Sequence, residues 1–196
     1  YINVGTGVAA GFVTGGHIVT GGHCNAGEIG HTSSGLSFRI SCECGRDDCV
    51  ESVISGLGLS NCARLLAPEY PDTRLTILAS QNYTADQVKE LEGQISAAEI
   101  FRLSDTDPLC HRLTEQAAKA LSNLLMNLVR FNDPQAIILG GGVVSDGFLL
   151  KKALGYTQAH PLRYVTAGIH LTTLDPRTIG LLGAASNAII GMEETI

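Results

Sequence analysis

The chain has 196 residues, and its length predicts one domain. Hydrophobic residues make up 44% and charged residues 16%, which is too apolar for a disordered chain. The formal net charge of −6 argues against a nucleic-acid surface, which usually carries a basic stripe. The sequence shows no membrane-span-length apolar run and no signal peptide, so we expect a cytoplasmic protein.

Short antiparallel strands are predicted in the first twenty residues, over 1–4, 8–14 and 17–20, with turns at Gly5-Thr6-Gly7 and at Gly15-Gly16. Residues 21–50 lack periodicity and are rich in Gly, Ser and Cys, which predicts a long ordered loop with a function. Because the chain opens on a strand without a methionine, we expect a further segment or domain before Tyr1.

Helical patterns begin near residue 50. Ser60 is a candidate cap for a helix that runs to Leu66, and Thr84 is a candidate start of another helix. The clearest helix spans 109–130, where leucine and alanine recur at helical spacing.

The last third of the chain alternates strands and helices. The predicted order is a buried strand at 136–139, the turn Gly140-Gly141-Gly142, a helix at 148–154, a strand at 168–174 and a helix at 178–190. Hairpins followed by helices and then β-α-β-α predict an α/β fold with a mixed sheet.

Three of the six cysteines, Cys42, Cys44 and Cys49, fall within eight residues, and His31 lies eleven residues before the first of them. Structural zinc sites take four tetrahedral ligands, and three cysteines with one histidine form an accepted set. Thiolates and imidazole suit zinc better than calcium or magnesium. The alternative is a set of free or disulfide-bonded cysteines, although Cys42 and Cys44 flank a single residue and would bond only with strain.

The other cysteines, Cys24, Cys62 and Cys110, are isolated in the sequence. Free cysteines behave as small hydrophobic residues, so we expect these three to be buried.

Two glutamates flank the predicted metal ligands, Glu28 before His31 and Glu51 after Cys49. A carboxylate that accepts several hydrogen bonds suits the adjacent hydroxyls of a sugar ring. The alternative is that Glu28 binds a loop amide and that Glu51 is a solvated residue at a helix start.

The two glycine turns, Gly5-Thr6-Gly7 and Gly140-Gly141-Gly142, could bring backbone amides close to a phosphate. Neither turn matches the phosphate loop of the nucleoside triphosphatases or the dinucleotide-binding fingerprint. Taken from the residues alone, an ordinary hairpin turn and an ordinary strand-end turn are favoured over phosphate binding.

Five elements in order carry a resemblance: Gly5-Thr6-Gly7, Ala26-Gly27-Glu28-Ile29-Gly30-His31, the stretch from Cys42 to Glu51 with its three cysteines, Ser55-Gly56, and Gly140-Gly141-Gly142. Together they closely resemble the ROK family of bacterial sugar kinases, N-acetylmannosamine kinases and sugar-responsive repressors. The resemblance is strongest over residues 1–56 and 139–144.

The resemblance implies an actin-like ATPase (ribonuclease-H-like) fold, of which residues 1–196 would be the C-terminal lobe, with a zinc loop at about 24–51. It implies zinc on His31, Cys42, Cys44 and Cys49, and sugar contacts from Glu28, His31 and Glu51. Gly5-Thr6-Gly7 resembles the family's second phosphate loop, and Gly140-Gly141-Gly142 its adenosine-side turn.

Two departures from the family pattern matter. Asp48 stands where the family usually has glycine before the third cysteine, which predicts a small shift in the loop. The family's N-terminal lobe, which carries the D-x-G-x-T loop and the catalytic aspartate, has no counterpart in the chain. Asp146 and Asp175 lie in the wrong sequence context for a general base, so we expect no catalytic residue here.

The resulting expectation is an ATP- and Mg²⁺-dependent kinase for a hexose or N-acetylhexosamine, working as a homodimer, with this chain alone inactive. The first alternative is the effector-binding domain of a sugar-responsive repressor, which would bind nucleic acid only through a preceding helix-turn-helix. The second is a zinc-stabilised interaction module without a sugar site.

Overall fold

The computed structural model describes residues 1–75, 95–175 and 178–193, with 187–193 described by their backbone alone. The helix start expected at Thr84 lies outside these residues.

A four-stranded mixed sheet with strand order β2-β1-β5-β6 forms the centre of the molecule. β1 (Ile2–Val4) pairs antiparallel with β2 (Val8–Ala10) and parallel with β5 (Ile137–Gly140), which in turn pairs parallel with β6 (Ile169–Leu171). Alternate side chains of these strands point into the core. The predicted α/β fold with a mixed sheet is confirmed.

The strand expected over 8–14 is wrong as one element, because the chain leaves the sheet after Ala10. Gly11 N–H donates to Tyr1 O, and Phe12 O then accepts from Val19 N–H, so the next residues pair with a different partner. That partner forms a separate hairpin, β3 (Val13–Thr14) with β4 (His17–Ile18), which turns at Gly15-Gly16 as predicted.

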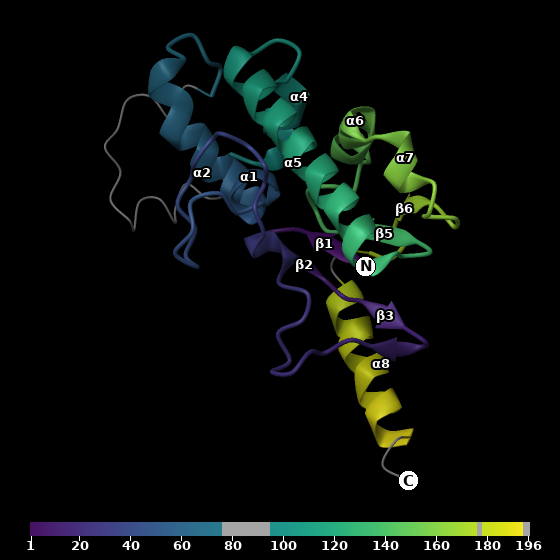
Figure 1. Cartoon of the computed structure of the whole chain (residues 1–196). Coiled ribbons are helices and arrows are strands. Elements are labelled where there is room, and N and C mark those ends of the chain that lie inside the picture. Colours follow the sequence, from purple (N-terminus) through teal and green to yellow (C-terminus); the bar gives the residue numbers. More distant parts are fainter. Residues whose placement is uncertain (76–94, 176–177, 194–196) are drawn as a thin grey trace.

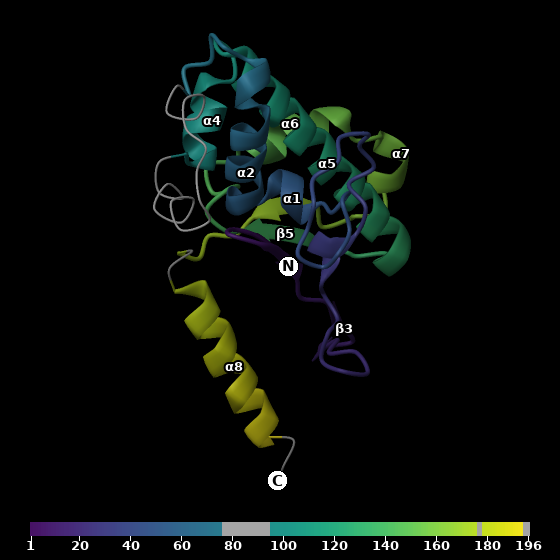
Figure 2. The ribbon, with the colours of Figure 1, turned by 90° about the vertical axis from the view of Figure 1, so that its left-hand side faces the viewer.

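The helices gather over one face of the sheet, whereas α8 extends away from the body (Figures 1 and 2). Their bounds are α1 Glu51–Ile54, α2 Gly56–Leu66, α4 Ala97–Leu103, α5 Pro108–Asn132, α6 Phe148–Tyr156, α7 Ala159–Leu162 and α8 Ile179–Glu193, with short 3-10 helices η1 at Ile29–His31 and η2 at Ala67–Glu69. Among the described residues, no helix is long and apolar enough to cross a membrane.

The predicted helix at 109–130 is α5, the longest helix described. The carboxylate of Asp107 accepts from Cys110 N–H at 3.0 Å, and Pro108 occupies the first helical position, where its missing N–H costs nothing. The helix ends at Asp133 in the left-handed conformation, ahead of Pro134. Its leucines and alanines pack against α6, α4, α1 and α2, so α5 is the central helix of the hydrophobic core.

Ser60 does not cap a helix, and that expectation was wrong. The helix begins earlier, because Ser55 Oγ accepts from Gly58 N–H at 2.9 Å, and Ser60 is buried within α2. Two further helices, α4 and α7, were not predicted.

Candidate metal centre and adjoining cavities

The four predicted zinc ligands converge. One ligand atom from each of His31, Cys42, Cys44 and Cys49 lies within 4.8 Å of all the others. His31 Nδ1 is 3.4 Å from Cys42 Sγ, and Cys44 Sγ is 3.4 Å from Cys49 Sγ. Sulfur ligands of a tetrahedral zinc site, each about 2.3 Å from the metal, lie about 3.8 Å apart, so the spacing fits such an ion.

Backbone hydrogen bonds fold the loop that carries these residues. Ser34 N–H donates to Asp48 O at 2.7 Å and Val50 N–H to Thr32 O at 2.9 Å, which brings Cys49 alongside the segment after His31. Between the cysteines, a tight turn forms as Gly45 N–H donates to Cys42 O at 3.0 Å. The four ligand atoms thus meet through local turns and one antiparallel bridge, Ser33 with Cys49.

Asp48, the residue that departs from the family pattern, binds a neighbouring arginine in the same loop. Its Oδ1 accepts from Arg46 Nε at 3.1 Å and from Arg46 Nη2 at 2.9 Å. The ligand atoms remain together with this residue in place.

The thiols differ in their proton affinity. Burial raises the pKa of Cys49 to about 12, and hydrogen bonds with the thiols of Cys44 and Cys42 act in the same direction. A backbone hydrogen bond from Arg46 lowers the pKa of the exposed Cys44, as does its hydrogen bond with Cys49. A divalent cation among the four donors would favour a thiolate at the buried Cys49, so the donor chemistry fits a metal.

The expectation that the isolated cysteines are buried is correct for Cys62 and Cys110 and wrong for Cys24. Cys24 is exposed, with φ of +55°, in the glycine-rich loop, where no core element is available to cover it.

The two glutamates differ in their contacts. Glu28 precedes η1 and its Oε2 is 3.8 Å from His31 Nε2, the ring nitrogen opposite the cysteines. Glu51 begins α1, and its Oε2 accepts from Val8 N–H at 2.7 Å. His31 therefore has one nitrogen toward the thiols and the other toward a carboxylate.

A cavity of about 330 Å³ adjoins the cluster. Its lining includes His31, Cys42 and Glu51, together with Thr6 from the first glycine turn and Leu57 from α2. Glu28 is not among these lining residues, but its carboxylate lies 3.8 Å from Nε2 of His31, which is one of them.

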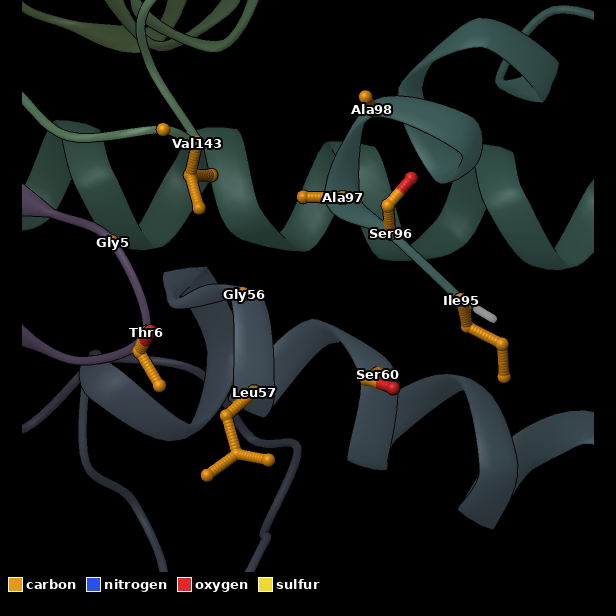
Figure 3. Close-up of a pocket in the computed structure, with 11 residues that line it drawn as sticks. Gly5, Thr6, Gly56, Leu57, Ser60, Ile95, Ser96, Ala97, Ala98 and Val143 are labelled. Atoms are coloured by element: carbon orange, nitrogen blue, oxygen red, sulfur yellow. The ribbon is translucent and has the colours of Figure 1, made fainter. Parts of the chain in front are cut away.

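A second cavity, of about 510 Å³, lies on the other side of Thr6 and Leu57, which border both. Figure 3 shows Thr6, Gly56 and Leu57 on the opposite side of this cavity from Val143 and the start of α4. Gly5 and Gly142, one from each predicted glycine turn, line this cavity. Gly140 instead packs closely against the side chain of Tyr1, Gly141 against the backbone of Val4 in β1, and Gly7 against Glu51.

Gly56 belongs to an element of the family resemblance but was given no role in a site. The other lining residues of the larger cavity that were missed from sequence are Leu57, Ser60, Ile95, Ser96, Ala97, Ala98 and Val143. A signal for part of this set was present. Ser96 is followed three residues later by Glu99, and Ser96 Oγ accepts from Glu99 N–H at 3.1 Å at the start of α4. Serine followed by glutamate at this spacing is typical of a helix N-terminus.

The mixed sheet, its helical cover and the adjoining cavities define an actin-like ATPase fold of the kind found in sugar kinases. The chain belongs to the ROK family, whose family model matches residues 1–186.

Curated relatives agree with this assignment. The chain is 31% identical over 189 residues to N-acetylmannosamine kinase of Escherichia fergusonii, covering 94% of this chain and 54% of that protein. It is 30% identical over 169 residues to glucokinase of Halalkalibacterium halodurans, covering 85% of this chain and 48% of that protein. The chain thus spans about half the length of these relatives.

Solved structures show the same fold. A ROK hexokinase from Thermus thermophilus matches 99% of this chain and 57% of its own, with a TM-score of 0.69 and 27% identity. A ROK glucokinase from Streptomyces griseus, solved with glucose and AMPPNP, matches 94% of this chain and 58% of its own, with a TM-score of 0.65 and 26% identity. A ROK transcriptional regulator, a homologue of the Escherichia coli MLC protein, shares the fold at a TM-score of 0.59 and 20% identity.

Proposed function

We propose that the chain is the sugar- and nucleotide-binding part of an ATP-dependent kinase that phosphorylates a hexose or an N-acetylhexosamine. The two curated relatives reported above are a glucokinase and an N-acetylmannosamine kinase, which supports these two sugar classes.

The observation that carries the proposal is the position of Thr6. It borders both the cavity beside Glu51 and His31 and the cavity lined by Gly5 and Gly142. Phosphoryl transfer depends on holding donor and acceptor next to each other, with groups that stabilise charge on the moving phosphoryl. A sugar in the smaller cavity and a nucleotide in the larger one would meet at this residue.

In this proposal, the carboxylates of Glu28 and Glu51 accept hydrogen bonds from sugar hydroxyls, and His31 forms a further hydrogen bond with the sugar. Gly5-Thr6-Gly7 and Gly140-Gly141-Gly142 hold ATP, with Mg²⁺ accompanying its phosphates. Zinc on His31, Cys42, Cys44 and Cys49 is structural: it would fix the loop that carries the sugar-binding residues.

The general base is proposed to lie outside these 196 residues, so that the chain alone releases no ADP. A homodimer and a cytoplasmic location are further proposals that rest on the family resemblance.

The test uses the chain together with any sequence that its gene encodes upstream. We expect ADP release that depends on both ATP and a sugar, with glucose and N-acetylmannosamine as the first substrates. Glu28→Gln should raise the sugar KM by about 10–100-fold, because a charge-assisted hydrogen bond is lost. Glu69→Gln, an exposed glutamate on η2, is the matched control and should leave KM unchanged.

Sugar binding without ADP release would instead favour the repressor, and a helix-turn-helix upstream would support that outcome. If the protein holds its metal but shows neither sugar binding nor turnover, the zinc-stabilised interaction module becomes the favoured function.

A further inference from the structure

Glu51 makes a contact that a sugar-binding carboxylate does not need. Its Oε2 accepts from the backbone N–H of Val8 at 2.7 Å, across 43 residues of sequence. Val8 directly follows the Gly5-Thr6-Gly7 turn and opens β2. Among the described residues, this amide is the one partner of the carboxylate, and Oε1 has none.

The side chain of Glu51 lies close to two glycines, one in the turn and one in η1. A Cβ on Gly7 would lie 2.7 Å from Glu51 Oε2, and a Cβ on Gly30 would lie 3.2 Å from Glu51 Cβ. Gly7 belongs to the turn and Gly30 to η1, which also carries His31. The Glu51 side chain therefore lies between the turn and the metal-bearing segment, with a glycine of each close to it.

The other end of the turn is held as well. Gly5 O accepts from Gly56 N–H at 2.8 Å, at the junction between α1 and α2. The turn is thus tied at both ends to the α1–α2 region: at Gly5 by a backbone amide and at Val8 by the Glu51 side chain.

We propose that Glu51 positions the Gly5-Thr6-Gly7 turn through Val8 and thereby couples nucleotide binding to occupancy of the sugar site. This inference rests on the proposed function and adds a second role for Glu51, as a positioning residue for the nucleotide. A ligand that fixes Oε1 also fixes Oε2, and so orders the turn. Coupling between sites is reciprocal, so nucleotide binding tightens sugar binding by the same factor.

Glu28 provides a matched comparison. It has the same charge and also lies beside His31, but none of its described contacts reaches the turn. Loss of Glu28 should therefore affect the sugar alone, whereas loss of Glu51 should affect both ligands.

The direct test is hydrogen exchange at the Val8 amide, followed by NMR on the chain as purified. In Glu51→Ala the amide should exchange about 10–100-fold faster than in the wild type, because its acceptor is gone. Glu51→Gln keeps an oxygen acceptor and should stay within about threefold, as should Glu28→Ala. Amides within α5 report the global stability of each variant, and metal content shows whether the loop has survived.

Glu51→Asp guards against misfolding of the alanine variant, since it keeps the charge but draws the carboxylate back by one methylene. It should also speed exchange at Val8. An unchanged Val8 rate in both Glu51→Asp and Glu51→Ala, or an equal rise in Glu28→Ala, overturns the positioning role.

The coupling itself is tested by calorimetric titration of Mg²⁺-ADP into the protein extended by its upstream sequence, with and without saturating sugar. Sugar should tighten ADP binding about 5–50-fold in the wild type and less than twofold in Glu51→Ala. Without sugar, Glu51→Ala should weaken ADP binding about 5–50-fold, and Glu28→Ala should change it less than twofold. Equal ADP affinities in the two variants overturn the nucleotide-positioning role, and an equal effect of sugar in the wild type and in Glu51→Ala overturns the coupling. If the wild type binds neither ADP nor sugar, the proposed function fails, whereas the exchange result at Val8 decides the positioning role separately.

Discussion

Gly27 directly precedes Glu28 and packs against the backbone of β2. Its φ is +107°, a region that residues with a β-carbon rarely adopt, and Ala10 N–H donates to its carbonyl at 2.8 Å. A β-carbon at this position would collide with the carbonyl oxygen of Ala10. Glycine here sets the direction in which the chain enters η1.

We expect Gly27→Ala to lower the free energy of unfolding by about 2–4 kcal/mol, because both the dihedral angle and the contact are unfavourable. Gly22→Ala, in the same loop, is the control: its β-carbon would meet nothing within 4 Å. Chemical denaturation of the two variants measures the difference. Equal stabilities would mean that the loop relaxes around the new methyl group.

At the scale of single residues, properties that depend on the type of side chain were predictable from the sequence. Thiols and an imidazole in a short loop indicated a metal site, and the four ligand atoms do converge. The exposure of Cys24 was not predictable, because burial depends on what packs over a loop. The bond between Glu51 and Val8 joins residues far apart in sequence, so no local pattern could indicate it.

Asp107 holds the start of α5 and connects it to the segment before the undescribed residues. Its carboxylate accepts from Cys110 N–H, from Arg74 N–H at 2.6 Å and from the hydroxyl of Thr73. Burial works to raise the pKa of Asp107, but these hydrogen bonds outweigh it, so the pKa lies below its usual value.

A depressed pKa in the folded state sets the sign of the pH dependence. The stabilisation from Asp107 is fully present above its unfolded pKa of about 3.9 and is lost as the pH falls through the folded value. We expect Asp107→Ala to lower the free energy of unfolding by about 2–4 kcal/mol at neutral pH, since it removes a cap and leaves buried donors unpaired. The loss should shrink below about pH 4.

Asp105→Ala is the control, because Asp105 is exposed two residues earlier in the chain. It should stay within about 0.5 kcal/mol of the wild type. Urea denaturation at neutral and at acid pH distinguishes the cases, and a pH-independent loss in Asp107→Ala would contradict the proposed sign.

Elements with strong periodicity were predictable, and elements set by caps or partners were less so. The spacing of leucines and alanines indicated α5 almost to its ends. The start of α2 was misplaced, because Ser55 and Ser60 are both plausible caps by residue type. The division of the expected strand 8–14 depends on pairing with Tyr1 and Val19, which periodicity does not encode.

At the scale of the whole molecule, the proposed metal would hold together the loop between β4 and α1, which has few buried apolar side chains. We expect about one zinc per chain and a fall in Tm of about 5–15 °C on chelation, because metal binding adds to the free energy of folding. Cys49→Ser should lose the metal, whereas Cys24→Ser, which changes an exposed cysteine outside the cluster, should keep it. Elemental analysis and thermal unfolding measure both. Full metal content in Cys49→Ser would contradict the ligand assignment.

The fold class and the family were predictable for the whole chain, because the order of strands and helices and the spaced motifs agree. The larger cavity was only partly predictable. It forms where α2, α4 and the two glycine turns meet, and that meeting depends on how distant elements pack.

The pairing of β1 with β5 also has a consequence for biosynthesis. Ile2 lies beside Leu139, so β1 receives its parallel neighbour β5 only after the intervening helices α1, α2, α4 and α5 have been synthesised. Until then, the β1–β2 hairpin carries an open edge, and such edges invite pairing with other nascent chains. Non-local pairing of this kind is also slow. We therefore expect the yield of folded protein to depend on chaperones and on the rate of translation.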